Sequence, residues 1–148
     1  GTYCFAIGKW YSRTLTCTTA PIPSEQVEMA AKRFEAVPDM LTVYVVRRNW
    51  GDGRHFIKVQ ADGGPTVETL PNTMVRMKLK PGIHTVAFEF EGKRQSTSVE
   101  GKAGDLRFVR IDGMVWSWKS SFEWAAEPEA SIRERALKAR LVADVVVR

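Results

Sequence analysis

The sequence predicts a mainly β protein, folded as one antiparallel β-sandwich of about eight strands. Short apolar runs are separated by turns that contain Gly and Pro, at intervals of about eight to twelve residues. From residue 41 onward, apolar and polar residues often alternate with a period of two, as they do in strands. Hydrophobic residues make up 44% of the 148 positions and charged residues 26%, a balance typical of a globular chain. We therefore expect an immunoglobulin- or transthyretin-like sandwich with one N-terminal and one C-terminal accessory helix.

Residues 1–23 are predicted to form an extended N-terminal arm. The only charged side chains of this arm are Lys9 and Arg13, and two prolines, Pro21 and Pro23, stiffen its end. Residues 24–148 are then the single sandwich domain with its flanking helices. No apolar run approaches the roughly 20 residues that a membrane-spanning helix needs.

The two cysteines of the chain, Cys4 and Cys17, both lie in this arm. Their spacing fits no zinc or redox motif, because the cysteines of such motifs stand two to four residues apart. We predict a disulfide that closes an N-terminal loop, which implies an oxidising compartment. Two unrelated thiols are one alternative, and lipoprotein acylation of Cys17 is another. Against acylation, the preceding residues 14–16 lack the small residue usual before an acylated cysteine.

Two helices flank the predicted strands. Ser24 is a good N-cap, and Glu25 and Glu28 suit the first turns because the helix dipole favours carboxylates there. The apolar stripe of this helix consists of Val27, Ala30, Ala31 and Phe34. We expect the helix to end before Pro38, since the residue preceding a proline disfavours helical geometry. Residues 127–140 have the composition of a second helix.

The apolar runs that we assign to strands cover residues 41–46, 56–61, 67–70, 75–80, 86–91, 96–99, 106–111, 114–124 and 142–147. The run 41–46 is nearly continuous in apolar residues, which predicts a strand covered on both faces. The run 67–70 is short and is expected at a sheet edge.

The clearest alternation predicts a hairpin around a Pro81–Gly82 turn. Its basic face carries Arg76, Lys78 and Lys80, and we expect Glu89 and Glu91 of the return strand to lie opposite them. The core face of the return strand is formed by Val86, Phe88 and Phe90. Because these aromatic side chains point away from the lysines, no nucleic-acid partner is expected despite a net charge of +5.

No constellation for catalysis is evident. His55 and His84 each stand alone at the start of a strand, without a partner at metal-ligand spacing. The chain has no Gly-x-Ser-x-Gly nucleophile motif, and Glu89 and Glu91 are expected on a solvated strand face. We therefore expect no enzymatic activity, no cofactor and no metal site.

Two tryptophan-containing segments are the candidate binding surfaces. The turn at residues 49–54 contains Trp50 close to Arg47, Arg48 and Arg54, and Trp with Arg is enriched at interface hot spots. In the segment 116–124, the side chains of Trp116 and Trp118 are expected on one face. The alternative for both segments is that the tryptophans are part of the core.

Four segments resemble a bacterial cell-envelope family of unknown function, whose members are often lipoproteins. The family's A-K-x-F, Y-V-x-R and P-G-x-H motifs, and a later strand, correspond to residues 30–34, 41–48, 79–86 and 100–109. The resemblance spans roughly residues 27–145 and implies an exported antiparallel sandwich without established catalytic residues. It also implies that Pro81, Gly82 and His84 form a structural turn.

These observations favour a non-catalytic binding or structural module of the bacterial envelope, either periplasmic or associated with the outer membrane. Its expected partner is another protein or an envelope component. Membrane association is expected only through a lipid anchor removed from this chain. The alternative is a periplasmic inhibitor or immunity protein that neutralises a toxin or hydrolase by inserting the loop at residues 49–54.

Overall fold

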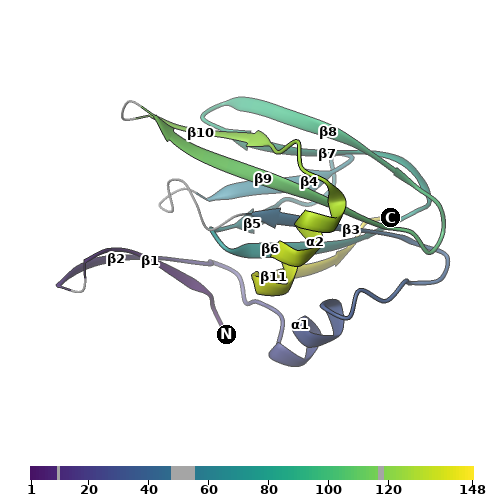
Figure 1. Ribbon diagram of the computed structural model, residues 1–148, viewed down its shortest axis with the longest axis horizontal. Coiled ribbons are helices and arrows are strands. Elements are labelled where there is room, and N and C mark those ends of the chain that lie inside the picture. The colour runs from purple at the N-terminus through teal and green to yellow at the C-terminus, as the bar shows by residue number, and fades with distance from the viewer. Residues whose placement is uncertain (10, 48–55, 117–118) are drawn as a thin grey trace.

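A computed structural model describes residues 1–9, 11–47, 56–116 and 119–148. The chain is mainly β, as predicted, and Figure 1 shows its strands and two helices. The strands are β1 (Cys4–Lys9), β2 (Ser12–Cys17), β3 (Leu41–Arg47), β4 (Ile57–Ala61), β5 (Val67–Thr69), β6 (Thr73–Leu79), β7 (Gly82–Phe90), β8 (Lys93–Gly101), β9 (Leu106–Trp116), β10 (Lys119–Trp124) and β11 (Arg140–Val146). The helices are α1 (Glu25–Ala31) and α2 (Glu129–Lys138). No helix in the described part of the chain is long and apolar enough to cross a membrane.

The strands form three sheets. A five-stranded sheet has the order β10-β9-β3-β6-β11, a four-stranded sheet the order β5-β4-β7-β8, and β1 and β2 pair separately. The expectation of purely antiparallel strands is wrong, because β3 pairs with β9, and β6 with β11, in parallel. These parallel pairs require crossover connections, and α2 lies in the connection that leads to β11. The described strands number eleven rather than about eight.

The two larger sheets share one apolar core. Val43 of β3, Val59 of β4 and Phe88 of β7 are each at most 1% exposed and belong to the same buried cluster. The short strand β5 lies at an edge, as predicted, and the predicted core residues Val86 and Phe88 are buried. The body of the molecule is thus two sheets held together by side chains from both.

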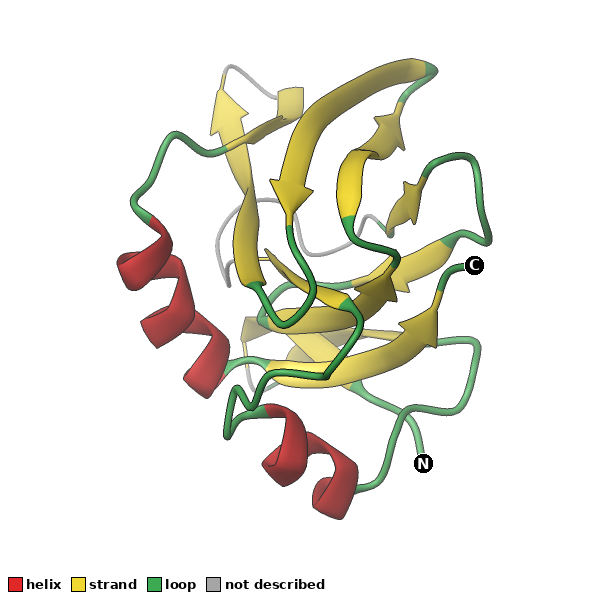
Figure 2. Cartoon of the chain, turned by 90° about the vertical axis from the view of Figure 1, so that its right-hand side faces the viewer, coloured by secondary structure: helices red, strands yellow, loops and turns green. Residues whose placement is uncertain are grey.

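A second core lies between the five-stranded sheet and the two helices, which Figure 2 shows on the same side of the strands. Here the Tyr44 ring of β3 stacks on Phe108 of β9 with centroids 4.9 Å apart, and Phe34 meets both rings edge-on. The Tyr44 hydroxyl donates a hydrogen bond of 2.9 Å to the carbonyl of Ala31. Strand β3 is therefore covered on both faces, as its apolar run predicts.

Helix α1 is shorter than predicted and ends at Ala31. The amides of Arg33 and Phe34 bond to carbonyls three residues earlier, and Phe34 itself has a left-handed φ of 52°. This turn brings the Phe34 ring into the aromatic cluster, so tertiary packing rather than Pro38 ends the helix.

The predicted hairpin of residues 75–91 is also wrong, since β6 and β7 belong to different sheets. Arg76 and Lys78 pair with Asp144 of β11, whereas Glu89 lies opposite Lys58 and Arg94 in the four-stranded sheet. The physical reason is that the apolar faces of β6 and β7 pack against each other across the core. The chain therefore turns a corner between the sheets, at Gly82 with a positive φ of 137°.

Candidate functional site

The N-terminal segment is a β-hairpin, not an extended arm. In the register of β1 and β2, Cys4 lies directly opposite Cys17 and Lys9 opposite Ser12. The two cysteines form the predicted disulfide, which closes the base of the hairpin. Two-stranded hairpins are marginally stable on their own in water, so this bond supplies the order that a larger sheet would provide.

The hairpin stands away from the two-sheet body (Figure 1). Among the described elements, β1 and β2 contact chiefly each other. The base is attached by Tyr3, whose hydroxyl donates to the Pro71 carbonyl at 3.0 Å and whose amide donates to the Thr18 hydroxyl at 3.1 Å. Tyr3 also packs against the inter-sheet core, and burial raises the pKa of its phenol. The base is thus anchored while the strands extend outward.

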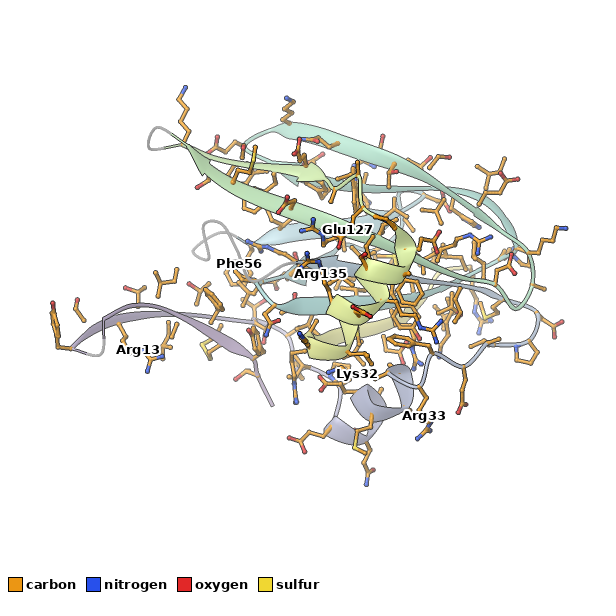
Figure 3. All side chains as sticks on the ribbon, viewed as in Figure 1. Arg13, Lys32, Arg33, Phe56, Glu127 and Arg135 are labelled. Atoms are coloured by element: carbon orange, nitrogen blue, oxygen red, sulfur yellow. A yellow bond between two sulfur atoms is a disulfide. The ribbon has the colours of Figure 1, made fainter. Side chains whose placement is uncertain are left out.

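The outer part of the hairpin combines exposed apolar and cationic side chains. Tyr11 is 64% exposed and Leu15 62%, although both are large and apolar. Arg13, which lies between them in the sequence, is also exposed, and Figure 3 shows it on the hairpin, clear of the body. Residues 1–24 contain Lys9 and Arg13 but no acidic residue. This part of the surface is therefore positive and apolar at once.

A groove of about 490 Å³ lies where the segment 18–23, which follows the hairpin, passes the edges of both larger sheets. Its lining residues are Thr18, Ala20, Pro21, Ile22, Pro23, Thr66, Val67, Glu68, Val142, Ala143, Asp144 and Val145. The Asp144 carboxylate is held by the Arg76 guanidinium through bonds of 2.9 and 2.6 Å, and Glu68 accepts from the Thr19 hydroxyl. The acidic side chains of the groove are thus engaged within the protein.

Arg47 is buried, so the prediction that it belongs to a contact surface is corrected. Its side chain is 2% exposed, donates to the Thr69 carbonyl at 2.7 Å and lies 5.0 Å above the Phe122 ring. The cause is the central position of β3, which buries even the last residue of the strand. Arg48, Trp50 and Arg54 lie outside the described residues, so the turn at 49–54 and its loop-insertion alternative stay predictions.

The second predicted surface lies at the β9–β10 hairpin. Trp116 ends β9 opposite Lys119, but its side chain and the whole of Trp118 lie outside the described part. Trp124, at the other end of β10, donates from its indole to the Gln95 carbonyl at 3.2 Å. Its ring is 5.1 Å from that of Phe88, so Trp124 is a packing residue.

His84 stabilises the turn at Pro81 and Gly82 through two hydrogen-bond contacts. One ring nitrogen contacts the Asp62 carboxylate, and Nε2 is 2.6 Å from the Lys80 carbonyl. Partial burial lowers the pKa of His84, but these two acceptors outweigh it and the pKa is raised above its ordinary value. His84 thus links the turn after β4 to the Pro81–Gly82 corner, while His55 lies outside the described residues.

A partly buried ionic cluster beside α2 was not predicted from the sequence. Glu127 accepts from Arg110 and, at 2.9 Å, from Arg135, and Figure 3 shows Glu127 and Arg135 side by side. Burial alone raises the pKa of Glu127, but the two arginines outweigh it and hold the pKa below its ordinary value. Arg110 lies on β9 and Glu127 in the loop before α2, without a shared motif, so only the tertiary fold brings them together. The cluster fastens the start of α2 to β9.

None of the described residues forms a group of three or more His, Cys, Asp or Glu side chains that could hold a metal ion. No family model and no curated protein matches the chain. The resemblance to an envelope family therefore stays a prediction. The disulfide-closed hairpin, with its exposed apolar and basic side chains, is the most distinctive surface described.

Proposed function

We propose that this protein is a non-catalytic binding module of the bacterial envelope, periplasmic or associated with the outer membrane. Its contact element is the β1–β2 hairpin. The observation that carries the proposal is that the hairpin holds Tyr11 and Leu15 largely exposed, outside both apolar cores. Large apolar side chains gathered on a projecting element are typical of interaction sites.

The disulfide supports both parts of the proposal. It preorganises the hairpin, which lowers the conformational entropy lost when a partner binds. Disulfides persist in oxidising compartments such as the periplasm and are rare in the cytosol. The same bond therefore favours an exported protein and a rigid contact element.

We further propose that the body serves as a two-sheet scaffold that holds the hairpin. The packing of the two larger sheets over one core supports this. Contact elements held by a rigid scaffold are a common arrangement in recognition proteins. The anchor at Tyr3 transmits that rigidity to the base of the hairpin.

Capture from a whole bacterial envelope extract tests the proposal. The oxidised protein is compared with a double variant, Tyr11→Ser with Leu15→Ser, and with a matched control, Ile83→Ser. Ile83 is 68% exposed but lies on β7, in the body. We expect the double variant to recover at least about tenfold less of any bound protein or lipid, because hot-spot contacts contribute 2 kcal/mol or more. Recovery that is equal for all three proteins contradicts the proposal.

A further inference from the structure

We propose that the partner of the hairpin is the surface of an anionic lipid bilayer, into whose interfacial region the hairpin inserts. This inference rests on the proposed function, because it takes the same hairpin as the contact element. It adds the chemical class of the partner. It also assigns membrane contact to the protein chain itself rather than to a lipid anchor.

Apolar residues lie on both faces of the hairpin. Residues directly opposite each other in an antiparallel pair point to the same face, and successive residues alternate. Ala6 pairs with Leu15 and therefore shares a face with it, whereas Phe5 and Ile7 lie on the other face. A protein groove covers one face of such a hairpin. The interfacial layer of a bilayer surrounds both faces and the end.

Tyr11 is of a residue type that suits the boundary between membrane and water. Tyrosine and tryptophan are enriched where membrane meets water, because their rings are apolar at one end and polar at the other. Tyr11, which is 64% exposed, immediately precedes β2. An exposed aromatic residue thus stands at the end of the hairpin that is farthest along the chain from the disulfide.

The charged residues of the hairpin are all basic. Lys9 ends β1 and Arg13 lies near the start of β2, so both basic residues belong to the distal half of the hairpin. Anionic headgroups attract each basic residue near a membrane surface. The first acidic residue of the chain is Glu25, in α1, so no carboxylate in the hairpin opposes this attraction.

The backbone sets the depth of insertion. Among the described strands, β1 and β2 pair only with each other, so no other described strand bonds to their outer backbone groups. Such groups are not tolerated in the hydrocarbon interior, where water is absent. The hairpin is therefore expected to stop at headgroup depth, and its binding is expected to be reversible and sensitive to salt.

Co-sedimentation with vesicles tests this inference. The oxidised protein is mixed with vesicles of phosphatidylcholine alone, or of phosphatidylcholine with phosphatidylglycerol. We expect binding to the anionic vesicles to be at least about tenfold stronger, and to weaken as salt is added. This comparison needs no protein variant, so it remains decisive even if a variant does not fold.

Variants then locate the contact. We expect Tyr11→Ser with Leu15→Ser, and separately Arg13→Glu, to lower vesicle binding about tenfold or more. The matched controls are Ile83→Ser and Lys93→Glu, which change exposed side chains of the body and are expected to leave binding within about twofold. Circular dichroism and thermal melting confirm that each variant is folded.

The outcomes separate the two proposals. No binding of the oxidised protein to anionic vesicles, or equal binding by the hairpin and control variants, overturns the bilayer inference. If hairpin-dependent capture of an envelope protein persists in that case, the proposed function stands with a protein partner. Hairpin-dependent binding to anionic vesicles supports both proposals.

Discussion

The β1–β2 hairpin and strand β3 show two different ways to hold a strand in place. All seven residues of β3 are buried, between the second sheet on one face and the helices on the other. In β2 the first four residues are exposed, and the covalent bond at Cys17 replaces the missing packing. Order in the body is therefore a property of the whole core, whereas order in the hairpin is local.

The body is expected to respond most strongly to a change in its core. Phe88 is 1% exposed, and Phe88→Ala should lower the free energy of unfolding by about 3–5 kcal/mol, through lost apolar burial and a cavity. Chemical denaturation measures this. The control Lys78→Ala changes a partly exposed side chain and should cost under about 0.5 kcal/mol. Equal losses at both positions contradict the assignment of faces in the two sheets.

Loss of the disulfide is expected to disorder the hairpin while the body stays folded. Replacing Cys4 and Cys17 by Ser should destabilise the hairpin by about 3 kcal/mol, the entropy of closing a loop of this size. Hydrogen exchange should accelerate at the amides of β1 and β2, while the melting temperature of the body stays nearly constant. A parallel fall in that melting temperature shows instead that the two regions unfold together.

Inside the body, a partly buried ion pair should contribute more to the free energy of unfolding than an exposed one. Arg76 and Asp144 are only 13% and 17% exposed and join β6 to the edge strand β11. Asp144→Asn should cost about 1–2 kcal/mol in the free energy of unfolding, because a charged hydrogen-bond pair is lost at a shielded site. The control Glu89→Gln changes the exposed pair with Arg94 and should cost under about 0.5 kcal/mol. A larger loss for Glu89→Gln than for Asp144→Asn contradicts the prediction that the shielded pair contributes more to stability.

The smallest effect concerns pH. Burial alone lowers the pKa of His84, but its two acceptors outweigh burial and raise the pKa, so protonation of the ring stabilises the fold. This stabilisation is complete below the pKa of histidine in the unfolded chain, near 6.5. This contribution is lost as the pH rises through the folded pKa. Burial alone raises the pKa of Asp62, but His84 and the Thr85 amide outweigh it and lower the pKa, so its contribution is lost in acid.

Stability should therefore fall slightly, by under about 1 kcal/mol, between pH 6 and pH 9. Asp62→Asn should flatten that part of the profile, as measured by thermal melting across the range. An unchanged slope in the variant shows that the histidine contributes nothing to it. The hairpin, which contains no histidine, should show no such dependence.

The sequence predicted best where a local pattern and the tertiary fold agree. The apolar run at 41–46 became a strand covered on both faces, and Ser24 caps α1 by accepting from the Val27 amide at 3.3 Å. It failed where two folds share one pattern. A Pro–Gly turn between alternating strands suits a hairpin and a corner between sheets equally well, and only packing across the core decides.

The candidate site was predictable in its covalent part only. Two cysteines in one segment indicated the disulfide, but the segment was expected to be an extended arm and its hairpin was not predicted. The exposure of Leu15 was not predictable, because an apolar residue in a strand is expected to be covered. Conversely, Arg47 was expected at the surface, since a charge at the end of a strand is usually solvated. Its burial follows from the position of β3 at the centre of the sheet.

The pairing of β11 with β6 affects how the protein is made. Residues 140–146 complete the sheet beside residues 73–78, so more than 60 residues must follow β6 before its outer edge is covered. At typical synthesis rates of about 5–20 residues per second, that edge stays open for several seconds. An open strand edge pairs readily with other chains. During biogenesis, the nascent chain should therefore be most vulnerable to aggregation between the completion of β6 and the arrival of β11.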